Sequence, residues 1–177
     1  MVIERNKDLQ ELVSCRHNGL VKIITGMRRC GKSFLLFRLF RRFLEDNGVA
    51  NDHIVEMAFD DYAFKEFRNP DKFYAYVKGR IIDDQPYYIL LDEVQMLDEF
   101  EDVLNGLLHI PNADVYVTGS NAKFLSKDII TEFRGRGYQI HVSPLSFAEF
   151  MSVYEGDRED GWNEYLLYGG LPPVVLL

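Results

Sequence analysis

The sequence predicts an α/β three-layer sandwich, in which a mostly parallel five-stranded sheet carries helices on both faces. Apolar, strand-like runs alternate with helix-like segments along the 177 residues, and this alternation is typical of parallel sheets. A glycine-rich segment at residues 26–33 joins the first strand directly to a helix. The length is that of one domain, so we expect residues 1–177 to fold around a single sheet.

Local sequence signals define the elements of the first half of the chain. Asn6 is a good helix N-cap, and apolar residues follow it at helical spacing as far as Cys15. The helix after the glycine-rich segment ends at Asn47-Gly48, a frequent C-terminal signal, and Pro70 suits the first turn of the next helix. The predicted elements are a helix over 6–15, a strand over 20–25, a helix over 33–46, a strand over 53–59 and a helix over 70–82.

Strand-like stretches of five residues indicate three more strands in the second half. The run Tyr87–Leu91 is nearly continuous, as in a strand that is buried on both faces. Pro111 ends the helix before the fourth strand, and Pro144 opens a short helix after the fifth. The predicted elements are strands over 87–91, 114–118 and 138–142 and helices over 99–109, 126–133, 144–150 and 162–168.

The charge of the chain limits the partners that it can bind. The formal net charge is −8, whereas non-specific binding to nucleic acid requires a basic face. Arg38, Arg41 and Arg42 share one face of a helix, which we interpret as a solvated face rather than a nucleic-acid contact. We therefore expect nucleic acid to be bound only through a region outside this chain.

Other features indicate a cytoplasmic protein. The N-terminus has no signal peptide, and no apolar stretch approaches the length of a membrane span. Cys15 and Cys30 are expected as reduced thiols, because a disulfide at Cys30 would distort the glycine-rich segment. The chain ends on the apolar segment Leu171–Leu177, which a folded domain rarely exposes to water. We therefore expect residues 1–177 to be the N-terminal domain of a longer protein.

Residues 26–33 match G-x-x-x-x-G-K-[ST], the phosphate-binding loop of P-loop NTPases. The two glycines let the chain curl so that N–H groups face phosphate oxygens, and the next helix adds its positive N-terminal end. Lys32 is expected to contact the β- and γ-phosphates, and the Ser33 hydroxyl is expected to bind Mg²⁺. A turn that merely joins a strand to a helix is the weaker interpretation. The predicted nucleotide-binding residues are Gly26, Met27, Arg28, Arg29, Cys30, Gly31, Lys32, Ser33 and Phe34.

An acidic pair follows the apolar run at 87–91. Asp92 is predicted at the carboxyl end of that strand, beside the phosphates, where it would hold Mg²⁺ through its water shell. The adjacent Glu93 is the candidate general base for the attacking water. The alternative is a strand that ends in a solvated acidic turn, which the upstream loop disfavours.

An extra strand between the loop strand and Asp92-Glu93 resembles the additional-strand, catalytic-glutamate division of P-loop ATPases. Guanine-specific enzymes carry Asn-Lys-x-Asp late in the chain, but the only Asn-Lys here is Asn6-Lys7. The resemblance therefore implies ATP and ADP as the nucleotides, rather than GTP, and Mg²⁺ as the cofactor.

The strand over 114–118 is followed by Gly119-Ser120-Asn121, which resembles the sensor-1 segment of AAA-type ATPases. The resemblance implies that a polar side chain here lies between Glu93 and the γ-phosphate. Asn121 is the first candidate and Ser120 the second. A helix cap is an equal and compatible interpretation of both residues.

Residues 133–137 resemble the position of an arginine finger in AAA-type ATPases. Arg136 is the preferred finger and Arg134 the second candidate, while a glycine-rich turn with solvated arginines is the alternative. Such a finger stabilises charge on the transferred phosphoryl group. It usually serves the nucleotide of a neighbouring subunit, so the resemblance also implies a possible homo-oligomer.

Together the motifs resemble the large prokaryotic group of AAA-like ATPases whose ATPase domain is followed by a second domain of unknown function. The matching segments are 20–35, 87–95, 117–125, 134–150 and 168–172. One departure is that the chain shows no C-terminal lid with a second sensor arginine.

The resemblance implies an ATPase domain that hydrolyses Mg·ATP and drives or gates a downstream domain. An ATP-gated switch with little hydrolysis is the alternative. A small-molecule kinase is weaker, because an Asp-Glu strand end suits water activation and no acceptor site is evident. The expected catalytic residues are Lys32, Glu93, Asn121, Arg134 and Arg136, and the expected metal ligands are Ser33 and Asp92.

Overall fold

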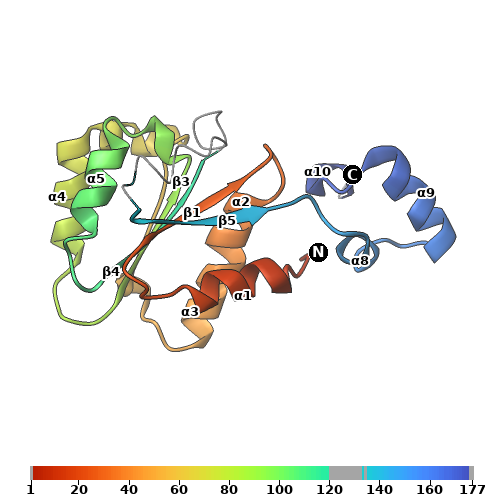
Figure 1. Ribbon diagram of the computed structural model, residues 1–177, viewed down its shortest axis with the longest axis horizontal. Coiled ribbons are helices and arrows are strands. Elements are labelled where there is room, and N and C mark those ends of the chain that lie inside the picture. The colour runs from red at the N-terminus through yellow and green to blue at the C-terminus, as the bar shows by residue number, and fades with distance from the viewer. Residues whose placement is uncertain (1, 120–132, 134, 176–177) are drawn as a thin grey trace.

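The computed structural model describes residues 2–119, 133 and 135–175. Five strands form one sheet in the order β2-β3-β4-β1-β5, and every neighbouring pair is parallel (Figure 1). The predicted strands are all confirmed to within one residue at each end, and the sheet is entirely parallel. The strands are β1 (Val21–Gly26), β2 (Ile54–Ala58), β3 (Tyr87–Asp92), β4 (Ala113–Thr118) and β5 (Gly137–Val142).

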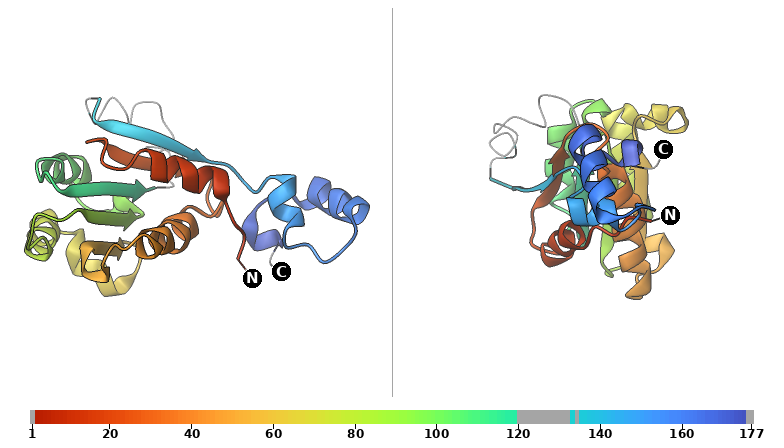
Figure 2. Two further views of the ribbon diagram at one scale, coloured as in Figure 1. Left: turned by 90° about the horizontal axis from the view of Figure 1, so that it is seen from below. Right: turned by 90° about the vertical axis from the view of Figure 1, so that its right-hand side faces the viewer.

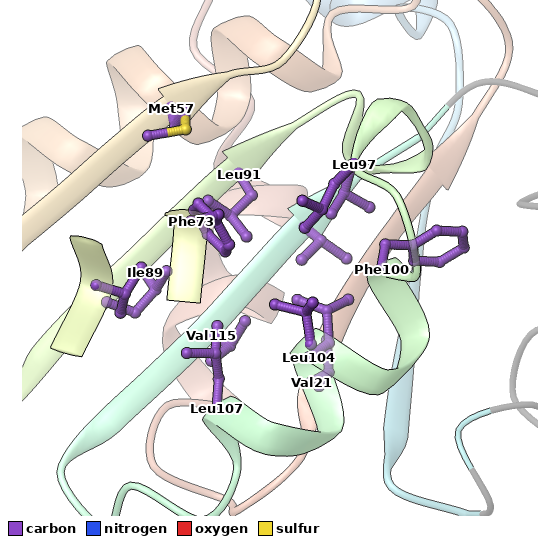
Figure 3. Packing of buried hydrophobic residues seen from close by; sticks show 14 of the residues in the cluster. Val21, Met57, Phe73, Ile89, Leu91, Leu97, Phe100, Leu104, Leu107 and Val115 are labelled. Carbon is purple, nitrogen blue, oxygen red and sulfur yellow. The ribbon is translucent and has the colours of Figure 1, made fainter. Parts of the chain in front are cut away.

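One face of the sheet is covered by α4 (Pro70–Arg80) and α5 (Phe100–Leu107). Alternate residues of a strand point to the same face, so Ile89, Leu91 and Val115 all meet these helices in one buried cluster (Figure 3). The predicted helices over 70–82 and 99–109 are thus confirmed, each about two residues shorter at its C-terminal end.

The opposite face is covered by α1 (Asn6–Ser14) and by the helix that follows the glycine-rich loop. The latter is continuous from α2 (Lys32–Phe34) through a π-helical stretch, η1 (Leu35–Phe40), to α3 (Arg41–Asp46). Asn6 does not cap α1, because the cap position belongs to Arg5, whose side chain makes no cap bond. The second buried cluster includes Leu12, Leu35, Phe40, Tyr116 and Ile140.

Three helices follow β5 and lie beyond the end of the sheet (Figures 1 and 2). α8 begins three residues later than predicted, since Ser146 forms a capping box with Glu149. α9 begins four residues earlier than predicted, where Asp157 accepts hydrogen bonds from two backbone N–H groups. The helices are α8 (Phe147–Met151), α9 (Arg158–Tyr168) and α10 (Pro172–Val175).

Short 3₁₀ helices complete the described residues. They are η2 (Asn51–His53), η3 (Tyr62–Arg68) and η4 (Val94–Met96), and the sequence predicts none of them. The predicted helix over 126–133 lies outside the described residues except at its last position. None of the helices in the described part of the chain has the length and apolar character that a membrane span requires.

A buried ion pair joins β1 to β4 near the N-terminal ends of these strands, away from the glycine-rich loop. Lys22 is fully buried and pairs with Asp114, which is 3% exposed. Asp114 also accepts hydrogen bonds from the Tyr116 hydroxyl at 3.1 Å and from the backbone N–H of His17 at 3.1 Å. The pair therefore links the strand that leads into the loop to its neighbour and to the segment between α1 and β1.

We predict that Asp114→Ala lowers the free energy of unfolding by about 3–5 kcal/mol, because it leaves the Lys22 ammonium buried without its partner. Urea denaturation measures the change. Glu4→Ala is the control, since it breaks the exposed ion pair with Arg42 and is expected to change stability by less than about 1 kcal/mol. Equal effects of the two substitutions would contradict a stabilising role for the buried pair.

Candidate nucleotide-binding site

The glycine-rich loop leaves the carboxyl end of β1, an interior strand of the sheet. At Gly26, φ is +149° and a Cβ would lie 2.3 Å from the carbonyl oxygen of Val142 on β5, so only glycine fits there. Arg29 and Gly31 are also left-handed, with φ of +66° and +98°. The loop therefore curls tightly before the helix begins at Lys32, as expected of a phosphate-binding loop.

The Lys32 side chain lies against the loop that precedes it. Its Nζ donates hydrogen bonds to the carbonyl oxygens of Gly26 at 3.1 Å and Met27 at 2.9 Å. Lys32 is 5% exposed, and the same side chain lines the cavity above the loop. The arrangement places one ammonium group between the loop and the cavity above it.

Asp92 ends β3 and touches the helix after the loop. Its Oδ1 accepts a hydrogen bond from the Ser33 hydroxyl at 2.9 Å and a second from the Thr118 hydroxyl at the end of β4. Burial raises the pKa of Asp92, and the two hydroxyl hydrogen bonds oppose that rise by stabilising the carboxylate. The two predicted metal ligands, Ser33 and Asp92, are thus in direct contact.

Glu93 follows in a left-handed backbone conformation with φ of +52°, which is rare for a residue with a side chain. Its N–H donates to the Thr118 hydroxyl at 3.2 Å, and its Oε2 accepts from the side-chain amide of Gln95. Such strain, on the order of 1–3 kcal/mol, persists where the surroundings fix it and is concentrated at functional sites. Glu93 therefore lines the cavity in a defined orientation.

A cavity of about 380 Å³ lies over the loop. Its lining combines residues of the loop, the following helix and the end of β3 with mainly apolar residues from the N-terminal and C-terminal parts of the chain. The first group is Arg28, Arg29, Gly31, Lys32, Ser33, Phe34 and Glu93. The second group is Ile3, Arg5, Leu145, Pro172 and Pro173. Four other predicted residues, Gly26, Met27, Cys30 and Asp92, do not line this cavity.

The oxygen atoms at the strand end fit Mg²⁺, which prefers a small number of carboxylate and hydroxyl ligands and keeps several waters. The Ser33 hydroxyl and the Asp92 carboxylate offer one such pair. Within the described residues, no group of three or more His, Cys, Asp or Glu side chains could hold a metal ion. An ion at Ser33 and Asp92 would therefore take its other ligands from nucleotide phosphates and water.

The remaining predicted residues are not brought to this cavity within the described residues. Asn121, Ser120 and Arg134 lie outside the part of the chain that the structure describes. Arg136 lies at the opposite end of the strands from the loop, where its carbonyl oxygen accepts a hydrogen bond from the N–H of Val21, the first residue of β1. At about 3.3 Å per residue, the length of β1 places the Arg136 backbone roughly 16 Å from the loop.

Sequence reasoning missed the residues that reach the site from distant parts of the chain. Thr118 joins Asp92 to Glu93, yet a threonine at the end of a strand carries no local mark of that role. Gln95 lies in one of the segments that carry the family resemblance, but its sequence position indicates no role. Arg5, Leu145 and Pro172 reach the cavity only because both ends of the chain fold back to it.

Burial determines the character of the Cys30 thiol. A thiol near a helix N-terminus and arginines can have a lowered pKa. Here burial raises the pKa of Cys30, although Lys32 and Arg5 act in the opposite direction. The fully buried side chain lies in the second apolar cluster, so it serves as a small packing group.

Comparisons with known proteins agree with this geometry. Residues 18–151 match the protein-family model described as AAA domain. An uncharacterized protein from Haemophilus influenzae is 32% identical over 181 residues, which cover 99% of this chain and 45% of the relative. An uncharacterized protein from Methanocaldococcus jannaschii is 25% identical over 173 residues, which cover 89% of this chain and 36% of the relative. The chain thus spans less than half the length of either relative.

The fold also resembles solved structures. The Hsp104:casein complex of S. cerevisiae contains a chain that superposes with a TM-score of 0.67 at 17% identity, over 99% of this chain and 36% of that chain. At this level of identity the likeness concerns the fold alone. The family match covers most of the chain and includes both the loop and the Asp92-Glu93 strand end. The chain therefore belongs to the protein family described as AAA domain.

Proposed function

We propose that this domain binds Mg·ATP over the glycine-rich loop and hydrolyses it to ADP and phosphate. The observation that carries the proposal is the meeting of the loop with the end of β3, where the Ser33 hydroxyl donates to Asp92 and Glu93 lines the cavity beside Lys32. The strand that lies between the loop strand and Asp92-Glu93 in the sequence, β2, is at the edge of the sheet and does not separate them in space. It is β4 that lies between β1 and β3, and this position supports the additional-strand, catalytic-glutamate class. ATP is favoured over GTP because the chain has no Asn-Lys-x-Asp late in its sequence.

In the proposed reaction the loop N–H groups hold the phosphates, and Lys32 exchanges its two loop carbonyl oxygens for the β- and γ-phosphate oxygens. When bound, Mg²⁺ neutralises negative charge on the phosphates. Asp92 and Ser33 would hold the ion. Glu93, oriented by its backbone and by Gln95, accepts the proton of the water that attacks the γ-phosphate.

The apolar residues that line the cavity can contact the nucleoside. Ile3, Leu145, Pro172 and Pro173 offer apolar contacts beside the loop, and a base needs such a surface. We propose that Leu145 and the two prolines of α10 enclose part of the bound nucleotide, a role that a separate lid has in other AAA-type ATPases.

A second function, an ATP-gated switch with little hydrolysis, is favoured by one contact. The Gln95 amide already occupies Oε2 of Glu93, which restricts how that oxygen can accept a proton from water.

In either case we propose that nucleotide state drives or gates a region outside residues 1–177. Any contact with nucleic acid would belong to that region, because residues 1–177 carry a net charge of −8.

We predict that two substitutions separate binding from chemistry. Lys32→Ala removes the ammonium expected on the phosphates and sharply weakens Mg·ATP binding in a calorimetric titration. Glu93→Gln retains binding but lowers turnover about 10²–10⁴-fold, because a positioned base contributes by that much. Lys72→Ala, at an exposed lysine, is the control and leaves both unchanged. Full turnover in Glu93→Gln would show that Glu93 is not the base.

We predict that Arg136 acts on the nucleotide of a neighbouring subunit, because its backbone lies beside the start of β1, at the end of the sheet away from its own loop. In the full-length protein, mixing Arg136→Ala with Glu93→Gln subunits then restores turnover that neither variant shows alone. A supplied arginine is worth roughly 10³–10⁵ in rate in well-studied GTPases, so even partial restoration is measurable. Specific activity that is independent of concentration, together with a silent Arg136→Ala, would contradict an arginine finger here.

A further inference from the structure

Arg5 is a buried arginine that the predicted chemistry does not use. It occupies the cap position of α1, and only 4% of the residue is exposed. Its Nη1 donates to the carbonyl oxygen of Cys30 at 2.7 Å, and its Nη2 donates to the carbonyl oxygen of Ser143 at 2.6 Å. One guanidinium group thus connects the glycine-rich loop to the segment that follows β5.

Two carboxylates balance the charge of this guanidinium. Asp8 of α1 lies 2.8 Å from Nη2, and Glu149 of α8 lies 3.6 Å from Nε. Glu149 is held in turn by the capping box, in which its Oε2 accepts from the backbone N–H and the hydroxyl of Ser146. Arg5 therefore contacts four parts of the chain, which are α1, the loop, the end of β5 and α8.

The contact with Cys30 determines the direction of a peptide group that is expected to bind phosphate. A trans peptide is planar, so its C=O and N–H groups point in opposite directions. Because Arg5 holds the carbonyl oxygen of Cys30, the N–H of Gly31 must point away from Arg5. Gly31 has φ of +98° and no side chain to restrict its rotation, so this peptide needs a partner to remain in one orientation.

Most of the N–H donors of Arg5 are engaged within the protein. An arginine has five N–H donors, and here three are directed at Cys30, Ser143 and Asp8, while the buried Nε lies 3.6 Å from Glu149 without a hydrogen bond. A Cβ at Gly31 would lie 3.6 Å from Nη1 and 3.7 Å from Cγ of Pro172 on α10. The loop peptide is thus enclosed between Arg5 and the C-terminal helices.

We infer that Arg5 is a positioning residue that fixes the Cys30–Gly31 peptide for phosphate binding and couples the occupied loop to helices α8–α10. This inference rests on the proposed function, because it assigns the loop to nucleotide phosphates. It predicts that the loop loses affinity when Arg5 is replaced, because the Cys30–Gly31 peptide is then no longer held in one orientation. It also predicts that ATP protects α8–α10 from amide hydrogen exchange only when Arg5 is present.

The test compares Arg5→Met, Arg5→Lys and the control Arg42→Met, which removes an exposed arginine paired with Glu4. Arg5→Met is expected to weaken Mg·ADP and Mg·ATP binding about 10- to 100-fold, since it removes hydrogen bonds from a charged donor. Arg5→Lys is expected to recover part of the affinity, because one ammonium can reach one carbonyl oxygen but cannot span two. Arg42→Met is expected to bind as the parent does.

Amide exchange is then measured at saturating Mg·ATP, so that weaker affinity cannot explain the result. The parent is expected to gain protection in α8–α10 and Arg5→Met is not. Parent-like affinity and protection in Arg5→Met would overturn the inference while leaving the proposed function intact, provided that Lys32→Ala in the same titration fails to bind. Should Arg5→Met not fold, parent-like affinity and protection in Arg5→Lys would overturn the inference in its place. A parent that binds no nucleotide would overturn both proposals.

Discussion

The contact of the Ser33 hydroxyl with the Asp92 carboxylate is the interaction on which the site depends. It joins the first turn of the helix after the loop to the end of β3, across the intervening strand β4. A buried carboxylate without donors would be costly, and the hydroxyls of Ser33 and Thr118 supply them. Because Thr118 also holds the N–H of Glu93, one threonine sets the relative positions of the two acidic residues.

The sheet makes this contact possible through its strand order. Because the strands are parallel, the loop, Asp92 and Thr118 all lie at the carboxyl ends of their strands. The Lys22–Asp114 pair joins β1 and β4 near their N-terminal ends. The two ends of the chain then complete the cavity. In the proposed account, nucleotide binding is therefore sensitive to the position of α8–α10, which reach the loop through Arg5 and Pro172.

Local patterns are enough to predict the sheet and to locate the loop and the strand end of the candidate site. The loop residues are consecutive, and Asp92 directly follows an apolar strand, so spacing alone identifies them. The partners of these residues cannot be found in this way, because they contact the site over long separations. Arg5 reaches Cys30 across 25 residues and Ser143 across 138, and Thr118 reaches Asp92 across 26.

The predicted boundaries of α8 and α9 are wrong because the caps at Ser146 and Asp157 depend on side-chain hydrogen bonds that the apolar pattern does not indicate. The roles of Lys32, Glu93 and Arg136, like those of Asn121 and Arg134, remain predictions.

The central claim is that Ser33 and Asp92 hold the metal of a bound nucleotide, and the most direct measurement is the affinity for ATP with and without Mg²⁺. In the parent, Mg²⁺ is expected to increase the affinity, and Asp92→Asn is expected to abolish that increase while retaining the metal-free binding that depends on the loop and Lys32. An undiminished effect of Mg²⁺ in Asp92→Asn would contradict the claim.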